Sequence, residues 1–90
     1  MLKLDITHDC LKFLRTLDVR QCRQVVMTLL NLLHTPEPHD SASLAGFPYR
    51  PVDIGAYRII YRIDGDILKV PLIGKRNDDE VYRALRRLGR

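Results

Sequence analysis

Three short runs of β-branched and aromatic residues follow one another in the second half of the chain, at 49–54, 57–63 and 67–74. The breaks between them carry Gly55 and Asp64-Gly65-Asp66, and such residues are typical of tight turns between paired strands. The sequence therefore predicts three consecutive antiparallel strands. This feature restricts the fold most, because it commits a long stretch of the chain to one small sheet.

Pro71 interrupts the third of these runs. Proline cannot donate a hydrogen bond to a neighbouring strand, so within sheets it is found on edge strands or at bulges. We expect one of these two arrangements at Pro71.

The first part of the chain has a different period. Residues 2–6 alternate apolar and polar side chains, which predicts a short strand with one buried face. A helix start follows at residues 7–9. Asp18 with Gln21 resembles a capping box, which opens a second helix; Pro36 and Pro38 cannot continue that helix. The apolar stripe expected on the first helix is Cys10, Phe13, Leu14 and Leu17, and that on the second is Cys22, Val25, Val26, Leu29, Leu30 and Leu33.

A final helix is indicated at the C-terminus. Asn77 with Glu80 again has the spacing of a capping box. The apolar residues that follow at helical spacing are Val81, Ala84, Leu85 and Leu88. We therefore expect a single α+β domain over residues 1–90 in the order βααβββα. An N-terminal strand and a helical hairpin would pack on a small, mainly antiparallel sheet.

Composition excludes several classes of protein. Apolar residues make up 46% of the chain and charged residues 29%, which is typical of a soluble globular domain. No apolar run approaches the roughly 20 residues that span a bilayer, and an acid at Asp5 argues against a secretory signal. We expect a cytoplasmic protein with no membrane contact. Cys10 and Cys22 lack the spacing of a zinc site or a redox motif, so we expect both to be core residues on helices.

Positive charge is concentrated in the second part of the chain. Residues 1–40 contain five Lys/Arg and five acids, whereas residues 41–90 contain ten and six. The net charge of +4 therefore belongs to residues 41–90. This asymmetry indicates a polyanion or an acidic protein as partner.

Arginines, rather than an acid–base pair, are the candidate functional residues. The chain has no Ser/His/Asp pattern, and Gly74-Lys75-Arg76 lacks the flanking residues of a phosphate-binding P-loop. Arg58 and Arg62 fall on one strand face, opposite the aromatic and aliphatic residues that alternate with them. Arginine binds phosphate through two parallel hydrogen bonds and stays charged at any working pH. Tyr82 could either stack on a base or pack against the sheet, and its spacing does not decide between these roles.

Three pieces of sequence together resemble the RelE/ParE toxin superfamily, and specifically its RelE branch. They are Leu44-Ala45-Gly46, the Gly-x-Tyr-Arg at 55–58 leading into IIYRI, and GKRNDDEVY at 74–82. The predicted order of elements is that of the same family. The resemblance implies a ribosome-dependent endoribonuclease that cuts mRNA in the A site by attack of a 2′-hydroxyl. It implies no metal and no cofactor.

The resemblance also assigns roles to individual residues. Arg58 would stabilise the phosphate in the transition state, Arg76 would hold it and assist the leaving oxygen, and Tyr82 would stack on a displaced base. The further RNA-binding candidates are Arg50, Lys75, Arg62, Arg83 and Arg86. The partners implied are the ribosome, mRNA and a cognate antitoxin that wraps the toxin, with DNA contacted only through the antitoxin.

One departure from the family leaves an alternative open. The RelE branch carries two lysines on the strand before Gly-x-Tyr-Arg, where this chain has Arg50 and Val52. Arginine is a poor general base because its pKa is above about 12, so Arg50 could contact phosphate without doing chemistry. Lys69 or Lys75 could act as the base if either reaches the site. The alternatives to an endoribonuclease are a ParE-type toxin that acts on DNA gyrase and a binding module whose basic sheet docks an acidic helix.

Overall fold

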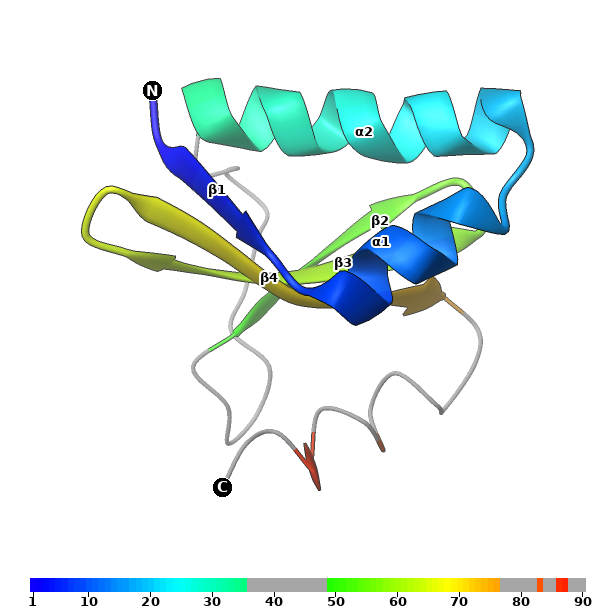
Figure 1. Cartoon of the computed structure of the whole chain (residues 1–90). Helices are drawn as coiled ribbons and strands as arrows, with labels where there is room; N and C mark the ends of the chain where they lie inside the picture. The colour runs from blue at the N-terminus through cyan, green and yellow to red at the C-terminus, as the bar shows by residue number, and fades with distance from the viewer. Residues whose placement is uncertain (36–48, 77–82, 84–85, 88–90) are drawn as a thin grey trace.

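A computed structural model describes residues 1–35, 49–76, 83, 86 and 87. The elements are β1 (Lys3–Ile6), α1 (His8–Arg15), α2 (Val19–His34), β2 (Arg50–Ile54), β3 (Tyr57–Asp64) and β4 (Ile67–Lys75). Both helices lie on one face of a four-stranded sheet, and β1 runs along its edge (Figure 1). This confirms the α+β class and the helix pair packed on a sheet.

Side-chain caps begin both helices. The hydroxyl of Thr7 accepts a hydrogen bond from the Cys10 backbone N–H at 3.3 Å, and the Asp18 carboxylate accepts one from the Gln21 N–H at 2.8 Å. Such caps satisfy backbone donors that have no partner inside the helix. The Gln21 side chain accepts a hydrogen bond from the Tyr57 hydroxyl at 3.0 Å, so the same residue that follows the cap ties α2 to the sheet.

The strand order is β1-β4-β3-β2. β2, β3 and β4 pair antiparallel in succession, as the sequence predicts, whereas β1 pairs parallel with β4. Both hairpin turns have glycine at the first central position, with φ of 54° at Gly55 and 62° at Gly65. Glycine tolerates this left-handed conformation, which the tight hairpin turns of antiparallel sheets require.

Pro71 lies in a bulge. Ile60 of β3 pairs with Leu72 of β4, but Arg62 pairs with Lys69, so the register shifts by one residue beside Pro71. β4 is an inner strand; of the two arrangements expected from the sequence, the bulge is therefore the correct one. The shift has a consequence for the site, because without it Val70 and not Lys69 would lie opposite Arg62.

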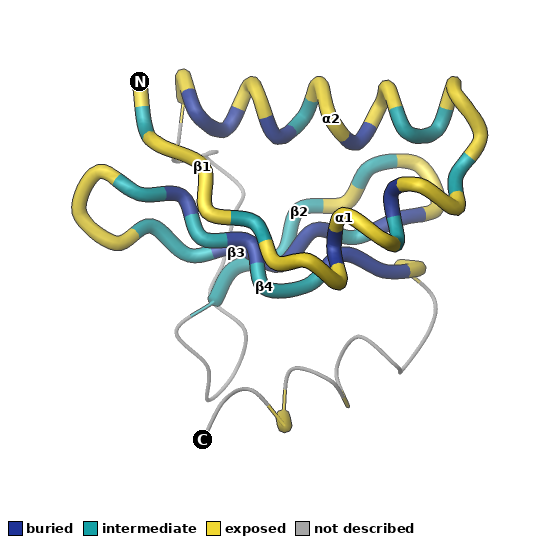
Figure 2. Tube along the Cα trace, viewed as in Figure 1, coloured by how far each residue is buried: buried dark blue, intermediate teal, exposed yellow. Residues whose placement is uncertain are grey.

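The core lies between the sheet and the helices, on the upper side of the sheet as drawn in Figure 2. Its fully buried members include Val25 of α2, Ile59 and Tyr61 of β3, and Leu68 of β4, each with 0% exposed surface. Cys10 is also buried, and its thiol donates to the Val70 carbonyl at 3.4 Å. Burial raises the pKa of this thiol. Both cysteines are free, Cys10 buried and Cys22 half-buried, which agrees with the expectation of helix residues that pack on the core.

Two burial predictions are wrong. The stripe expected on α2 includes Val26 and Leu30, but these are 36% and 45% exposed, and Leu32 is buried in their place. Apolar residues cover more than one face of α2, so periodicity alone cannot choose which face meets the sheet. Leu4 of β1 is 42% exposed, because β1 is an edge strand and its buried face is incomplete.

The predicted C-terminal helix falls largely outside the described residues. Those that are described there, residues 83, 86 and 87, are helical and exposed. No helix in the described ranges is both long enough and apolar enough to cross a membrane.

Candidate functional site

The sheet face that points away from the helices, here called the far face, carries the arginines predicted as functional. Arg58 pairs with Asp53 on β2 and with Gly74 on β4, so these three residues form one row across the sheet. Residues paired across a sheet have their side chains on the same face. Arg58 and Arg62, four residues apart on β3, therefore both lie on the far face, which confirms the predicted facing of this pair.

Arg58 is held by a carboxylate within its own row. Its Nε donates to Asp53 Oδ1 at 2.6 Å and its Nη2 donates to Oδ2 at 3.1 Å. The Arg58 side chain is 18% exposed and that of Asp53 37%. A two-point contact of this kind fixes the plane of the guanidinium as well as its position. The predicted phosphate ligand is thus oriented before any substrate binds.

Arg76 lies at the same end of the far face. Its backbone N–H donates to the Ala56 carbonyl at 2.8 Å, which fixes it beside the β2–β3 turn. The hydrogen bond from Arg58 lowers the pKa of Asp53; partial burial opposes this, and the charges of Arg58 and Arg76 lower it further. The same contact raises the pKa of Arg58. Among the described residues, two cations and one carboxylate therefore share this corner, and the sum of these three charges is positive.

A second group of charges lies further along the far face. Arg62 Nη2 and Lys69 Nζ lie 3.6 Å and 3.2 Å from the same Asp64 oxygen. The Arg62 guanidinium carbon sits 5.7 Å from the centre of the Tyr49 ring, within the range of a cation–π contact. Arg62 is four positions along β3 from Arg58, which is about 13 Å at the usual rise per residue. The two cation groups would therefore meet different parts of an extended ligand.

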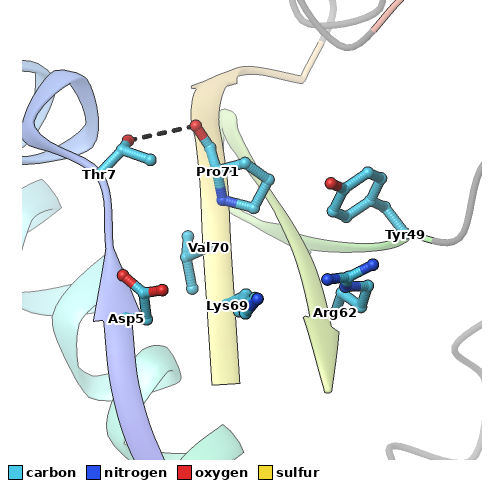
Figure 3. A pocket seen from close by; sticks show the side chains of 7 residues that line it. All are labelled: Asp5, Thr7, Tyr49, Arg62, Lys69, Val70 and Pro71. Atoms are coloured by element: carbon cyan, nitrogen blue, oxygen red, sulfur yellow. Dashed lines mark hydrogen bonds between the residues drawn. The ribbon is translucent and has the colours of Figure 1, made fainter. Parts of the chain in front are cut away.

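Figure 3 shows the pocket beside this second group. It lies where β1, β4 and β3 meet, next to the bulge, and has a volume of about 180 Å³. Asp5 and Thr7 border it on the β1 side, and Tyr49 and Arg62 on the other. The Thr7 hydroxyl donates to the Pro71 carbonyl at 3.2 Å, which secures the β1 end against the bulge.

The remaining candidates are dispersed. Arg50 pairs with Tyr61 and Lys75 with Tyr57; both therefore start from the face that meets the helices, not from the far face. Arg83 and Arg86 are exposed. Tyr82 lies outside the described residues. The structure thus brings Arg58 and Arg76 together, sets Arg62 apart from them, and leaves Arg50 and Lys75 on the other side of the sheet.

Asp53 and Tyr49 are among the far-face residues that sequence reasoning missed. Asp53 could have been found by pairing outwards from the two-residue turn at 55–56, because this places Ile54 opposite Tyr57 and Asp53 opposite Arg58. Tyr49 could not be found in this way, because it lies before the first paired residue of β2, Arg50. Within the described ranges, no three His, Cys, Asp or Glu side chains gather as a metal site would require.

Comparison with known proteins bears on the fold rather than on the individual site residues. Neither a scan against protein-family models nor a search of curated proteins gave a match. Among solved structures, the isolated E. coli RelE toxin aligns with a TM-score of 0.73 and 28% identity, covering 98% of this chain and 99% of that one. The chain belongs to the RelE-like toxin superfamily.

Two further structures support the RelE-like fold. The archaeal RelE–RelB complex from Pyrococcus horikoshii aligns with a TM-score of 0.72 at 19% identity, covering 84% of this chain and 96% of that one. The RelBE2 toxin–antitoxin complex from Mycobacterium tuberculosis gives 0.71 at 21%, covering 83% and 98%. At these identities the likeness concerns the fold alone. The RelE-like superfamily predicted from the sequence is confirmed by the match to the isolated E. coli toxin.

Proposed function

We propose that this chain is the toxin of a type II toxin–antitoxin pair and that it cleaves mRNA in the ribosomal A site, which stops translation. The observation that carries the proposal is that Arg58 and Arg76 lie at one corner of the far face, where both charges act on Asp53, in a chain with the RelE-like fold. Two arginines converging on one place are suited to an anion whose charge increases during reaction.

The reaction proposed is an intramolecular transesterification of the RNA phosphodiester. The 2′-oxygen loses its proton and attacks the adjacent phosphorus, while the bond from phosphorus to the 5′-oxygen breaks. The products are a 2′,3′-cyclic phosphate and a 5′-hydroxyl, which receives a proton. Arg58 stabilises the charge on the phosphoryl oxygens, Arg76 holds the phosphate and assists the leaving oxygen, and Tyr82 stacks on a displaced base. Supporting RNA contacts come from Arg62 on the far face and from the exposed Arg83 and Arg86.

Two lysines, Lys69 and Lys75, are the candidate proton acceptors. Lys69 is paired with Asp64 in the second cation group, about four residues along β3 from the Arg58 row. Lys75 starts from the opposite face of the sheet. Since neither lysine lies in the Arg58–Arg76 corner, we propose that rate acceleration rests mainly on charge stabilisation and on positioning of the RNA by the ribosome.

The partners proposed follow from the same family. RelE-type chains are seen in complex with RelB antitoxins in E. coli, P. horikoshii and M. tuberculosis. We propose a cognate antitoxin that wraps this chain and contributes any contact with DNA. Ribosome and mRNA are the targets, which places the protein in the cytoplasm. The proposed reaction uses no metal ion and no cofactor.

Cleavage in a reconstituted translation reaction, mapped by primer extension, tests this function. Wild type should cut within A-site codons, and Arg76→Ala and Tyr82→Ala should each abolish the cuts. Lys12→Ala is the matched control, because Lys12 is an exposed cation on α1, away from the far face. Cuts that persist in Arg76→Ala, or that vanish equally in Lys12→Ala, would contradict the assigned roles.

A ParE-type action on gyrase is the second candidate. The observation that favours it is the carboxylate on Arg58: the central cation of the nuclease site is already paired, and the expected lysine pair is absent. Folded wild type that leaves mRNA intact but inhibits gyrase supercoiling would establish this function in place of the first.

A further inference from the structure

The pocket beside Arg62 and Lys69 exists because of the Pro71 bulge. The register shift brings Lys69 opposite Arg62 and onto the far face; without it, Val70 would occupy that position. The bulge therefore turns an apolar position into a second cation beside Arg62. Figure 3 shows Arg62 and Lys69 with Pro71 and Tyr49 among the side chains that line the pocket.

A hydrogen-bond donor in this pocket is left without a partner. Arg62 Nε is buried, yet among the described residues it makes no hydrogen bond. A buried donor without an acceptor destabilises a protein, so such a group calls for an explanation, and a bound ligand is one. An anionic oxygen is the acceptor that a guanidinium binds most strongly.

The two cations of the pocket form ion pairs with one carboxylate among the described residues. Arg62 and Lys69 share the single carboxylate of Asp64, which is itself 57% exposed. Asp5 borders the pocket on the far side of Lys69 but lies beyond ion-pair distance of the described cations. Two converging cations can thus accept an anion that approaches from the Tyr49 side, while Asp5 opposes one that approaches from β1.

The size of the pocket limits the ligand. At about 180 Å³ it is smaller than the roughly 300–1,000 Å³ of sites that hold whole small-molecule ligands. One phosphate group with part of its nucleotide fits this space better than a cofactor does. The Tyr49 ring, which makes a cation–π contact with the Arg62 guanidinium, borders the same space.

We infer that this pocket is a second phosphate subsite for single-stranded RNA, in which Arg62 and Lys69 bind a phosphodiester of a nucleotide other than the one that is cut. It lies about 13 Å along β3 from the Arg58 row, so it receives a neighbouring part of the strand. The inference rests on the proposed function only for the identity of the ligand as RNA. The subsite would fix the direction of the RNA across the far face.

Binding of a non-cleavable RNA tests the subsite. A fluorescein-labelled hexanucleotide with every 2′-hydroxyl methylated is titrated with wild type and variants at several salt concentrations, by fluorescence anisotropy. For single strands the slope of log K against log salt changes by about 0.7 for each phosphate contact. Lys69→Gln should lower the magnitude of the slope by this amount and weaken binding several-fold. Asp5→Asn should tighten it, because the opposing charge is removed.

Lys12→Gln is the matched control, since it removes one exposed positive charge from α1. Equal slopes for Lys69→Gln and Lys12→Gln would overturn the inference, as would weaker binding by Asp5→Asn. Thermal unfolding of each variant shows whether it is folded. Arg62→Lys, which keeps the charge but loses Nε, should also weaken binding; wild-type affinity in that variant counts against the role of the buried donor.

A second measurement identifies the source of the anion. Amide shifts of Lys69 and Val70 are followed by ¹⁵N NMR with the methylated RNA, with inorganic phosphate and with a hexaglutamate peptide. The RNA should shift both amides at the lowest concentration. Stronger effects from the peptide would assign the pocket to an acidic protein segment, and effects from inorganic phosphate alone would make it a site for free anions; either result overturns the RNA assignment.

The ribonuclease function and the second phosphate subsite can be refuted independently of each other. If wild type never cleaves mRNA but RNA binding depends on Lys69, the subsite stands and the ribonuclease function does not. If A-site cuts occur and Lys69→Gln binds RNA like the control, the function stands and the subsite does not.

Discussion

Replacing Asp53 by asparagine should have opposite effects on the stability of the far face and on its proposed affinity for RNA. The side chains of Arg58 and Asp53 are 18% and 37% exposed and make two hydrogen bonds. Hydrogen bonds to charged groups contribute about 1.5–3 kcal/mol when buried, whereas fully exposed ion pairs contribute about 1 kcal/mol or less. For this half-exposed pair, we expect Asp53→Asn to lower the free energy of unfolding by about 1–2 kcal/mol. In a domain of this size that lowers Tm by about 5–10 °C.

The same substitution should strengthen RNA binding. A carboxylate close to Arg58 repels an incoming phosphate and competes for the same guanidinium. Two charges about 4 Å apart interact by roughly 1 kcal/mol in water and by more where water is partly excluded. Removing the charge of Asp53 should therefore raise affinity for the methylated hexanucleotide about fivefold. Asparagine retains one oxygen that can accept from Arg58, so the guanidinium keeps part of its orientation.

Asp66→Asn is the matched control for this prediction. Asp66 lies in the other hairpin turn, is 71% exposed, and pairs with Lys3 at 3.7 Å, so losing it should change stability by only a few tenths of a kcal/mol. Anisotropy titration and thermal unfolding are measured on the same preparations. Weaker RNA binding by Asp53→Asn would refute the competition argument and would show that Asp53 serves to position Arg58.

Three further predictions concern stability and reactivity. The pKa of Asp53 is lowered in the folded state. Its contribution to the free energy of unfolding is therefore present above its unfolded pKa of about 3.9 and is lost as pH falls through the lower folded value. The difference in unfolding free energy between wild type and Asp53→Asn, measured by urea titration, should accordingly vanish in acid. Leu29→Ala should cost about 2–4 kcal/mol and the adjacent Leu30→Ala less than 1, since Leu29 is 3% exposed and Leu30 45%. In the native protein, iodoacetamide should modify the half-buried Cys22 much faster than the buried Cys10, whose pKa is raised; equal rates by mass spectrometry would contradict the burial of Cys10.

Local features of the sequence were sufficient to predict the antiparallel sheet of β2, β3 and β4. Gly55 and Gly65 each adopt the positive φ that a two-residue hairpin turn needs, and the pairing of β2, β3 and β4 follows from these turns. The Thr7 and Asp18 caps were visible for the same reason, since a cap is decided by residues within one helical turn. Contacts of short sequence separation are the part of a fold that a single sequence specifies most directly.

Long-range features were not predictable in the same way. The parallel pairing of β1 with β4 joins residues more than sixty positions apart, and no local pattern encodes it. The proximity of Arg62 and Lys69 depends on a one-residue register shift, because a shift of one residue moves a side chain to the opposite face of a sheet. The sequence indicated either an edge strand or a bulge at Pro71. It did not indicate that the bulge would place Lys69 opposite Arg62.

Each of the two cation groups on the far face contains its own carboxylate, which would favour RNA held by the ribosome over free RNA. Arg58 is paired with Asp53, and Arg62 and Lys69 with Asp64, so an RNA phosphate must compete with an acid at both places. A free RNA strand also loses conformational freedom when it binds, which makes simultaneous competition at two places about 13 Å apart unfavourable. An mRNA already held in an extended form by the ribosome loses less freedom and can engage both groups together. The internal acids would therefore select against free RNA, and Asp53→Asn should increase binding of free RNA more than binding to the programmed ribosome.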